Sequence, residues 1–466
     1  MTQEPASLKT DETDRTPADH PFGKMRGDLV ETAKLAMPVV FAELGWMGMG
    51  IVDTIMVGKL GPAAIAGVSL GNVLFFTIAI AGLGLLLGLD TLVSQSFGAG
   101  DVRDCHRSLV QGIYLSIFLT PLLMLIVAAL TPMLASWRVH ADVVEVAIPY
   151  LKTLNWGMFP LLLYVATRRY LQGMNLVRPV MFALISANLV NWLGNLLLID
   201  GRFGLPALGT VGSGIATFVG RIWMAGVLVA AIILQDLRKR TDLRHTSLAV
   251  DWPRLRSLLA IGTPTAIQIT LEVGVFAAAA VLAGRLGTRQ LAAHEVVLNV
   301  ISVAFTVPLG ISSAAAARVG QAIGRRDPQG AALAGWSAII LGAGFMTAFV
   351  LAFSLAPRTI LGTYTADRGV ITTGVSLLFV AALFQIFDGT QVIASGALRG
   401  AGETKASMFC NLVAHWGLGL PVGYLLAFEA GWGLIGLWVG LMVGLVVAGS
   451  ALLVAWRTSV RRLKNL

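Results

Sequence analysis

The sequence predicts an all-α integral membrane protein whose twelve transmembrane helices form two six-helix bundles. Hydrophobic residues make up 56% of the 466 residues and charged residues only 13%, about half of the usual share in soluble domains. A water-soluble chain of this length has no core large enough to bury so many apolar side chains. Because one transmembrane helix takes about 20 apolar residues, a dozen of them joined by short loops use nearly the whole chain.

Apolar runs long enough to span a bilayer recur along the chain and leave three polar segments outside them. The predicted spans, in order, are 31–57, 64–92, 107–131, 143–167, 178–199, 210–235, 257–283, 291–317, 331–355, 370–397, 405–428 and 432–456. Residues 1–30 are predicted to be a largely disordered tail, residues 236–256 a linker and residues 457–466 a basic tail. This division predicts an N-terminal lobe over residues 31–235 and a C-terminal lobe over residues 257–456.

Lys and Arg are unevenly distributed between the two sides of this map. The loops after the even-numbered spans, together with both tails, hold most of them, among them Arg168 and Arg169 after the fourth span. The opposite loops hold only Lys59, Arg138, Arg202, Arg285, Arg289, Arg358 and Arg368. Because Lys and Arg are retained on the cytoplasmic side, we expect both termini and the linker in the cytoplasm. The same rule explains the net charge of +9, so no nucleic-acid partner is predicted.

An internal repeat relates the two halves. A shift of 226 residues aligns Pro38 with Pro264 and carries the motif Gln-x-x-Gly-x-x-Asp from residues 95–101 to residues 321–327 without a gap. With an even number of spans in each half, the two bundles have the same orientation and are related by a pseudo-two-fold axis along the membrane normal. Two such bundles facing each other are typical of a transporter with a cavity between them.

Acidic residues lie well inside three of the predicted spans: Asp53, Glu272 and Asp388. Each costs roughly 2.5 to 3.5 kcal/mol at the centre of a membrane helix, which argues for a role. Gln268 precedes Glu272 by four residues, and Gln385 and Gln391 flank Asp388 at three residues on either side, so each of these two acids shares a helix face with an amide. Such a face can coordinate a cation or hold a protonated acid. The alternative is an acid satisfied by a neighbouring helix without further function.

Further polar residues are candidates for lining the cavity. Glu43 lies ten residues before Asp53, about 15 Å lower on the same helix. Glu295, beside His294, forms a polar face near the start of the eighth span, where water from the outer interface is the alternative explanation. Asp90, near the inner end of the second span, favours helix termination or a gate contact. Asparagines recur at helical spacing on the fifth span, with interhelical hydrogen bonding as the alternative to cavity lining: Asn188, Asn191 and Asn195.

Nucleotide-binding, zinc-protease and hydrolase motifs are absent from the sequence. Without an ATP-binding domain in the chain, the energy for transport comes from an ion gradient or from a separate subunit. Glu272 and Asp388 belong to one half and are predicted to share one ion. Burial of carboxylates favours proton loading, whereas Na+ takes several oxygen ligands, so both coupling ions stay open and no other cofactor is expected.

Several longer motifs occur together and involve both halves. They are MGIVDTIMVGKLGPAAIAGVSLG, GLGLLLGLDTLVSQSFGAGD, LQGMNLVRPVM, LAAHEVVLN, DGTQVIASGALRGAG and GLPVGY. Through them, over residues 31–456, the chain resembles the multidrug and toxic compound extrusion (MATE) family, most closely its bacterial NorM-like branch. The resemblance implies a V-shaped pair of lobes in the bacterial inner membrane. Such a protein exports organic cations, including dyes and fluoroquinolone-like compounds, in exchange for Na+ or H+ entering the cell.

The resemblance also implies roles for individual residues. Asp53, Glu272 and Asp388 match the acids that the family uses in ion coupling and substrate handling. Glu295 stands where relatives commonly carry glutamine, so it is expected to alter the substrate range or the coupling stoichiometry.

Three functions follow from the sequence. The prediction is a monomeric antiporter that works by alternating access, with organic cations, the coupling cation and the lipid bilayer as partners. A flippase for lipid-linked glycans is the second, but such proteins often carry extra spans and a basic cavity, and Lys152 and Arg221 are the only basic residues well inside the predicted spans. An intramembrane enzyme, suggested by His294 and Glu295, is the third, and no paired metal-ligand spacing supports it.

Overall fold

The computed structural model describes residues 21–136, 140–239 and 241–465, and every regular element in these ranges is helical. The N-terminal half contains α1 (Pro21–Gly58), α2 (Pro62–Leu86), α3 (Gly88–Gly98), α4 (Val102–Leu130), α5 (Ala141–Asn155), α6 (Met158–Gly173), α7 (Val177–Leu198) and α8 (Gly209–Lys239). The C-terminal half contains α9 (Trp252–Leu286), α10 (Thr288–Gly324), α11 (Pro328–Leu355), α12 (Pro357–Gly362), α13 (Arg368–Gly400), α14 (Thr404–Asn411), α15 (Leu420–Tyr424) and α16 (Gly433–Lys464). The α14–α15 region also contains two π-helical stretches, η5 (Leu412–Gly419) and η6 (Leu425–Glu429).

Eleven helical segments in the described ranges are long and apolar enough to cross a membrane. The fourth predicted span is the exception, because it falls on α5 and α6, which are 15 and 16 residues long. Both helices pack against α8, with α2 beside α5 and α4 beside α6. They are separated at Gly157, where a Cβ would lie 2.7 Å from Nη1 of Arg221. Two short helices in series therefore make the twelfth crossing.

Helices extend into all three of the predicted polar segments. α1 begins at Pro21, inside the segment predicted as a tail, and residues 1–20 of that tail lie outside the described residues. α8 runs to Lys239 and α9 begins at Trp252, so the linker is shorter than predicted. α16 continues to Lys464 through the predicted basic tail. Basic residues in the last turns of α8 and α16 favour these extensions, because cations stabilise the C-terminal end of a helix dipole.

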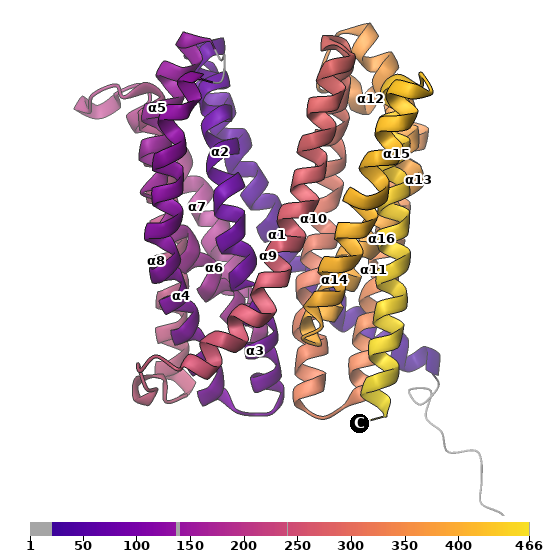
Figure 1. Ribbon diagram of the computed structural model, residues 1–466. Coiled ribbons are helices and arrows are strands. Elements are labelled where there is room, and N and C mark those ends of the chain that lie inside the picture. The colour runs from indigo at the N-terminus through magenta and orange to yellow at the C-terminus, as the bar shows by residue number, and fades with distance from the viewer. Residues whose placement is uncertain (1–20, 137–139, 240, 466) are drawn as a thin grey trace, which may run out of the picture.

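Each half begins with a long helix that starts beside the opposite half. Leu258, near the start of α9, is buried among the N-terminal helices, and Ala36 of α1 is buried among the C-terminal ones. Figure 1 shows α9 running from the N-terminal helices across to the C-terminal ones, with the beginning of α1 in indigo on the opposite side. Arg318 of α10 holds this part of α1 through an ion pair with Asp28 at 2.5 Å. The two halves are therefore interlocked through their first helices.

The two halves meet at the end of the molecule that contains the turns at residues 99–101 and 325–327, called the closed end below. There a Cβ on Gly262 of α9 would lie 2.1 Å from the carbonyl oxygen of Leu85 on α2, so the two helix backbones touch. Over the described residues, the side-chain hydrogen bonds that join α1–α8 to α9–α16 all lie at this end. The Lys and Arg distribution predicts that the closed end faces the cytoplasm.

Candidate functional site

Asp53 of α1 is buried in the N-terminal half, against α7 and α8. Asn195 Nδ2 donates a hydrogen bond to Asp53 Oδ1 at 2.6 Å, and Thr217 Oγ1 donates one to Asp53 Oδ2 at 3.1 Å. Asn191, one turn before Asn195, accepts from Asn195 Nδ2 at 3.2 Å. Asp53 is 5% exposed, and both asparagines are fully buried. Both carboxylate oxygens thus have donors from other helices, which compensates for the loss of water around a buried charge.

Two of the three asparagines predicted on this helix face belong to the Asp53 site, and the third does not. Asn188 Nδ2 instead donates to the carbonyl oxygen of Gly45 at 2.9 Å and so joins α7 to α1. Interhelical hydrogen bonding, the alternative reading of these asparagines, is therefore what their amides do. Thr217 was not predicted from the sequence, because one threonine in an apolar span gives no signal of its own. Asn195 Oδ1 is buried without a partner among the described residues, which leaves a spare acceptor beside the site.

Glu43, predicted to line the inner cavity, forms an ion pair with Arg168 of α6. Arg168 is 5% exposed, and its Nη1 lies 3.5 Å from Oη of Tyr164. The prediction that Arg168 and Arg169 lie in a loop is wrong, because α6 continues to Gly173, past the end of the apolar run. Glu43 and Asp90 neutralise these two arginines in the structure. The hydropathy of the chain does not show such long-range pairs.

Glu272 of α9 and Asp388 of α13 lie at a similar depth in the C-terminal half. Gln268 Nε2 donates to Ser395 Oγ at 3.3 Å, and this bond relates the depths of the two helices. Glu272 lies one turn and Asp388 two turns beyond this contact, rises of about 6 and 10 Å. Asp388 is buried and Glu272 is half-buried. In contrast to Asp53, neither carboxylate hydrogen bonds or pairs with another of the described residues.

The glutamines predicted around Asp388 are buried on α13. Gln391 Nε2 donates to Asn411 Oδ1 at 3.0 Å, and Gln385 Nε2 lies 3.6 Å from Sδ of Met346. The Oε1 atoms of both glutamines are buried without a partner in the described part of the chain. The C-terminal half therefore has two carboxylates and two unpaired amide oxygens on α9 and α13. Carboxylate and amide oxygens can accept a hydrogen bond from a protonated acid or ligate Na+.

The π-helical stretch η5 packs against α9 next to Glu272. Trp416 Nε1 donates to the carbonyl oxygen of Leu271 at 2.9 Å. His415 is 1% exposed, and its Nε2 has no partner among the described residues. Asn411 and His415 were not predicted from the sequence, although their spacing of four residues places both on one face of the eleventh span. Single turns of π-helix often occur at functional sites, which fits the position of this stretch.

Glu295 does not join this group. Its side chain is exposed on α10, whereas its neighbour His294 is fully buried and accepts from Trp438 Nε1 at 3.1 Å. The two side chains therefore lie in different environments. Over the described ranges, no group of three or more His, Cys, Asp or Glu residues is placed to hold a metal ion.

Asp90 joins both halves at the closed end. Its Oδ2 lies 3.1 Å from Nε of Arg399 on α13 and 3.5 Å from Nη1 of Arg169 on α6. Arg169 also donates to Ser313 Oγ of α10 at 2.8 Å. This arrangement agrees with a gate contact at Asp90. Arg169 and Arg399 lie beyond the predicted spans, in turns by which α6 and α13 extend past them, and both are paired with Asp90.

Known proteins match this chain along nearly its whole length. The MatE family profile matches residues 38–197 and 264–425. Multidrug resistance protein NorM of Burkholderia vietnamiensis is 37% identical over 436 residues, which cover 92% of this chain and 93% of that protein. A probable multidrug resistance protein NorM of Mesorhizobium japonicum is 35% identical over 450 residues, covering 94% and 95% of the two chains. The chain belongs to the MATE family.

Solved structures of other transporters have the same fold as this MATE chain. A eukaryotic MATE transporter, AtDTX14, superposes with a TM-score of 0.85 at 22% identity, covering 95% of this chain and 99% of that one. A MOP superfamily transporter from Pyrococcus furiosus superposes with a TM-score of 0.84 at 21% identity, covering 94% and 98%. These structures confirm the predicted all-α, MATE-like membrane fold, and the NorM relatives confirm the NorM-like branch.

The MatE profile matches the chain twice, and the matches begin at residues 38 and 264, an offset of 226 residues. This is the offset of the repeat that aligns Pro38 with Pro264. Membership of the MATE family also makes the chain a membrane transporter and not an enzyme, as predicted.

Proposed function

We propose that this MATE protein is a secondary active multidrug efflux antiporter, which exports cationic or amphipathic organic compounds in exchange for inward Na+ or H+. The names of the NorM relatives support drugs as the cargo. The observation that carries the proposal is the state of Glu272 and Asp388. These two carboxylates, one buried and one half-buried, lie at similar depth on α9 and α13 without a partner among the described residues. An unpaired acid inside a membrane helix costs free energy, so its presence supports a role in binding a ligand.

In the proposed cycle, Glu272 and Asp388 hold either the coupling ion or the positive charge of the drug. The unpaired amide oxygens of Gln385 and Gln391 supply further ligands for Na+ or acceptors for a protonated acid. Asp53 is proposed as a coupling acid of the N-terminal half, where proton or ion uptake competes with its bonds from Asn195 and Thr217. Binding of the ion displaces the drug, and the return step carries the ion inward.

Alternating access is proposed to use the closed end as the inner gate. The bonds between the halves lie at this end, which supports an outward-facing state with the closed end toward the cytoplasm. Both termini then lie in the cytoplasm. The proposed location is the inner membrane of a bacterium, and the proposed oligomeric state is a monomer. Opening requires the Asp90–Arg399 pair to part while the opposite ends of the halves approach each other.

The test is drug efflux from proteoliposomes under a pure pH gradient and then under a pure Na+ gradient. Wild-type protein is expected to respond to one of the two. Glu272→Gln and Asp388→Asn, which keep size and remove the charge, are expected to lower gradient-driven efflux at least tenfold with normal membrane insertion. Glu145→Gln is the matched control, because this acid is exposed on α5 and has no proposed role, and its efflux is expected to stay near wild type. Wild-type efflux from Glu272→Gln would defeat the assignment.

A further inference from the structure

The segment between α8 and α9 is fastened to α4 of the N-terminal half. Gln111, 1% exposed, donates from Nε2 to the carbonyl oxygen of Ala249 at 3.1 Å and accepts from the N–H of Asp251 at 3.1 Å. Tyr114 Oη donates to the carbonyl oxygen of Leu248. These bonds fix the backbone of residues 248–251 along α4. We call this segment, with the first turn of α9, the linker strap (residues 248–256).

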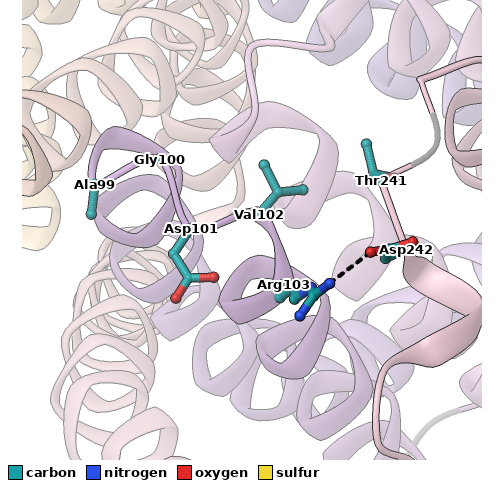
Figure 2. A pocket seen from close by; sticks show the side chains of 7 residues that line it. All are labelled: Ala99, Gly100, Asp101, Val102, Arg103, Thr241 and Asp242. Carbon is teal, nitrogen blue, oxygen red and sulfur yellow. Dashed lines mark hydrogen bonds and ion pairs between the residues drawn. The ribbon is translucent and has the colours of Figure 1, made fainter.

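The beginning of the same connection is held by an ion pair. Arg103 Nη2 lies 2.8 Å from Oδ2 of Asp242, which Figure 2 shows bridging the start of α4 and the linker. Hydrogen bonding from Arg103 lowers the pKa of Asp242 below its usual value, so the carboxylate stays charged and paired. The described part of the connection, residues 241–251, is therefore attached to α4 at both of its ends.

Large apolar side chains of the linker strap face outward. Leu248 is 70% exposed, Trp252 is 69% exposed, and Val250 lies exposed between them. The bonds to Gln111 and Tyr114 use the backbone of the strap and leave these side chains uncovered. Exposure of three such apolar side chains to water is unfavourable, and a patch of this kind indicates a surface that another apolar surface covers.

The neighbouring helices place the linker strap at the edge of the bilayer. On α4 the first large exposed apolar residue is Ile117, one turn beyond Tyr114. On α8 the exposed apolar face ends at Leu237, and Arg238 and Lys239 follow directly. Both helices therefore change from apolar to polar surface at the level of the strap. Trp at this level is typical of the membrane interface.

The exposed bases around the linker strap have no acidic partners among the described residues: Arg107, Arg238, Lys239, Arg244 and Arg256. The nearby acids are already engaged. Asp236 accepts from Thr241 at 2.7 Å, Asp242 pairs with Arg103, and Asp251 caps α9 through the N–H of Arg254. An excess of positive charge thus surrounds the apolar side chains.

We propose that the linker strap is a membrane-interface anchor that binds the anionic lipid headgroups of the inner leaflet. Leu248, Val250 and Trp252 enter the boundary between headgroups and acyl chains, and the unpaired bases bind the lipid phosphates. Trp252 and Arg256 lie four residues apart on one exposed face of α9, so one lipid can contact both. The partner is the lipid surface, and the anchor holds the start of α9 to the N-terminal half at the membrane edge.

The experiment uses the full chain and does not depend on transport. Native mass spectrometry compares retained phosphatidylglycerol with retained phosphatidylcholine on wild-type protein and on Arg244→Gln/Arg256→Gln. The double variant is expected to lower the preference for phosphatidylglycerol by about 25-fold, since each of the two bases near an anionic surface contributes about fivefold. Arg325→Gln is the matched control, because this base is exposed at the closed end away from the strap, and it is expected to leave the preference unchanged. Inorganic phosphate in excess is expected not to compete.

A second measurement reports the depth of the linker strap. A nitroxide on Leu248→Cys, with Cys105 and Cys410 replaced by alanine, is placed in vesicles of phosphatidylcholine with or without phosphatidylglycerol. The label is expected at the headgroup boundary, accessible to oxygen, and deeper when phosphatidylglycerol is present. An unchanged lipid preference in the double variant overturns the proposal. So does displacement by inorganic phosphate, or a label that stays in water in both vesicles, which would indicate a soluble partner for this surface.

Discussion

Gly98 of α3 and Gly324 of α10 occupy equivalent positions in the two halves, and each packs against the helix that carries the other. A Cβ on Gly98 would lie 2.1 Å from the carbonyl oxygen of Gln321, and a Cβ on Gly324 would lie 2.0 Å from that of Gln95. Because the contact is reciprocal, the same small residue is needed at the same position of both repeats. The closed end is therefore built on backbone contact along the predicted pseudo-two-fold axis.

Substitution of either glycine by alanine is expected to open the closed end. The added methyl group meets backbone atoms, which cannot turn away as a side chain can, and overpacking of this kind costs about 1–3 kcal/mol. The closed state should lose about fivefold or more in population relative to the open one. The measurement is thiol labelling of Ser313→Cys, at the closed end, in a background with Cys105 and Cys410 replaced by alanine. Gly226→Ala on α8 is the control, because nothing lies within 4 Å of its added Cβ; equal labelling in all three proteins would contradict the prediction.

The Asp90 network predicts a second way to open this end. Asp90→Asn leaves Arg169 and Arg399 buried beside a neutral amide, and loss of one partner of a buried ion pair costs about 3–5 kcal/mol. Lower thermal stability and faster labelling of Ser313→Cys are expected. The double variant Asp90→Asn/Arg399→Gln is expected to recover part of the stability, because it removes one of the two stranded charges. A double variant no more stable than Asp90→Asn would show that the pair with Arg399 is not what holds this end.

The motif Gln-x-x-Gly-x-x-Asp illustrates what the sequence could predict. Its repetition at an offset of 226 residues revealed two related halves, because both copies serve the same purposes. The glycines make the backbone contact, and Asp101 and Asp327 cap α4 and α11 by accepting from backbone N–H groups at 2.9 and 2.8 Å. Such needs are local or symmetric, so they leave a pattern in the chain itself.

The partners of the buried charges could not be predicted in this way. Helical spacing placed Asn191 and Asn195 on one face, but only the packing of α7 against α1 and α8 brings them to Asp53 and Thr217. Arg168 was assigned to a loop because its charge ends the apolar run. The hydropathy of the chain does not show that Glu43 neutralises this charge in the folded protein. Long-range pairs of this kind depend on which helix faces which, and one helix alone does not carry that information.

The Asp53 site predicts a difference between two substitutions of Thr217. Thr217→Val removes the hydroxyl that donates to Asp53 Oδ2 and keeps the shape, and a hydrogen bond to a charged group contributes about 1.5–3 kcal/mol. A lower unfolding temperature and weaker efflux are expected. Thr217→Ser keeps the hydroxyl and is expected to lie closer to wild type in both measurements. If the valine variant is as stable and active as the serine variant, the hydrogen bond to Asp53 does not contribute measurably to stability or efflux.

The ion pair between Glu43 and Arg168 predicts a loss of stability rather than of substrate affinity. Glu43→Gln leaves Arg168, which is 5% exposed, without its acidic partner at a cost of about 3–5 kcal/mol, so less folded protein is expected in the membrane. Its KM for drug efflux, measured on the folded fraction, should stay within about twofold of wild type, because the carboxylate is occupied by Arg168 rather than by cargo. Glu43→Gln/Arg168→Met removes both charges and should restore part of the abundance. A large rise in KM with normal abundance would instead place Glu43 in contact with the drug, as the sequence alone had suggested.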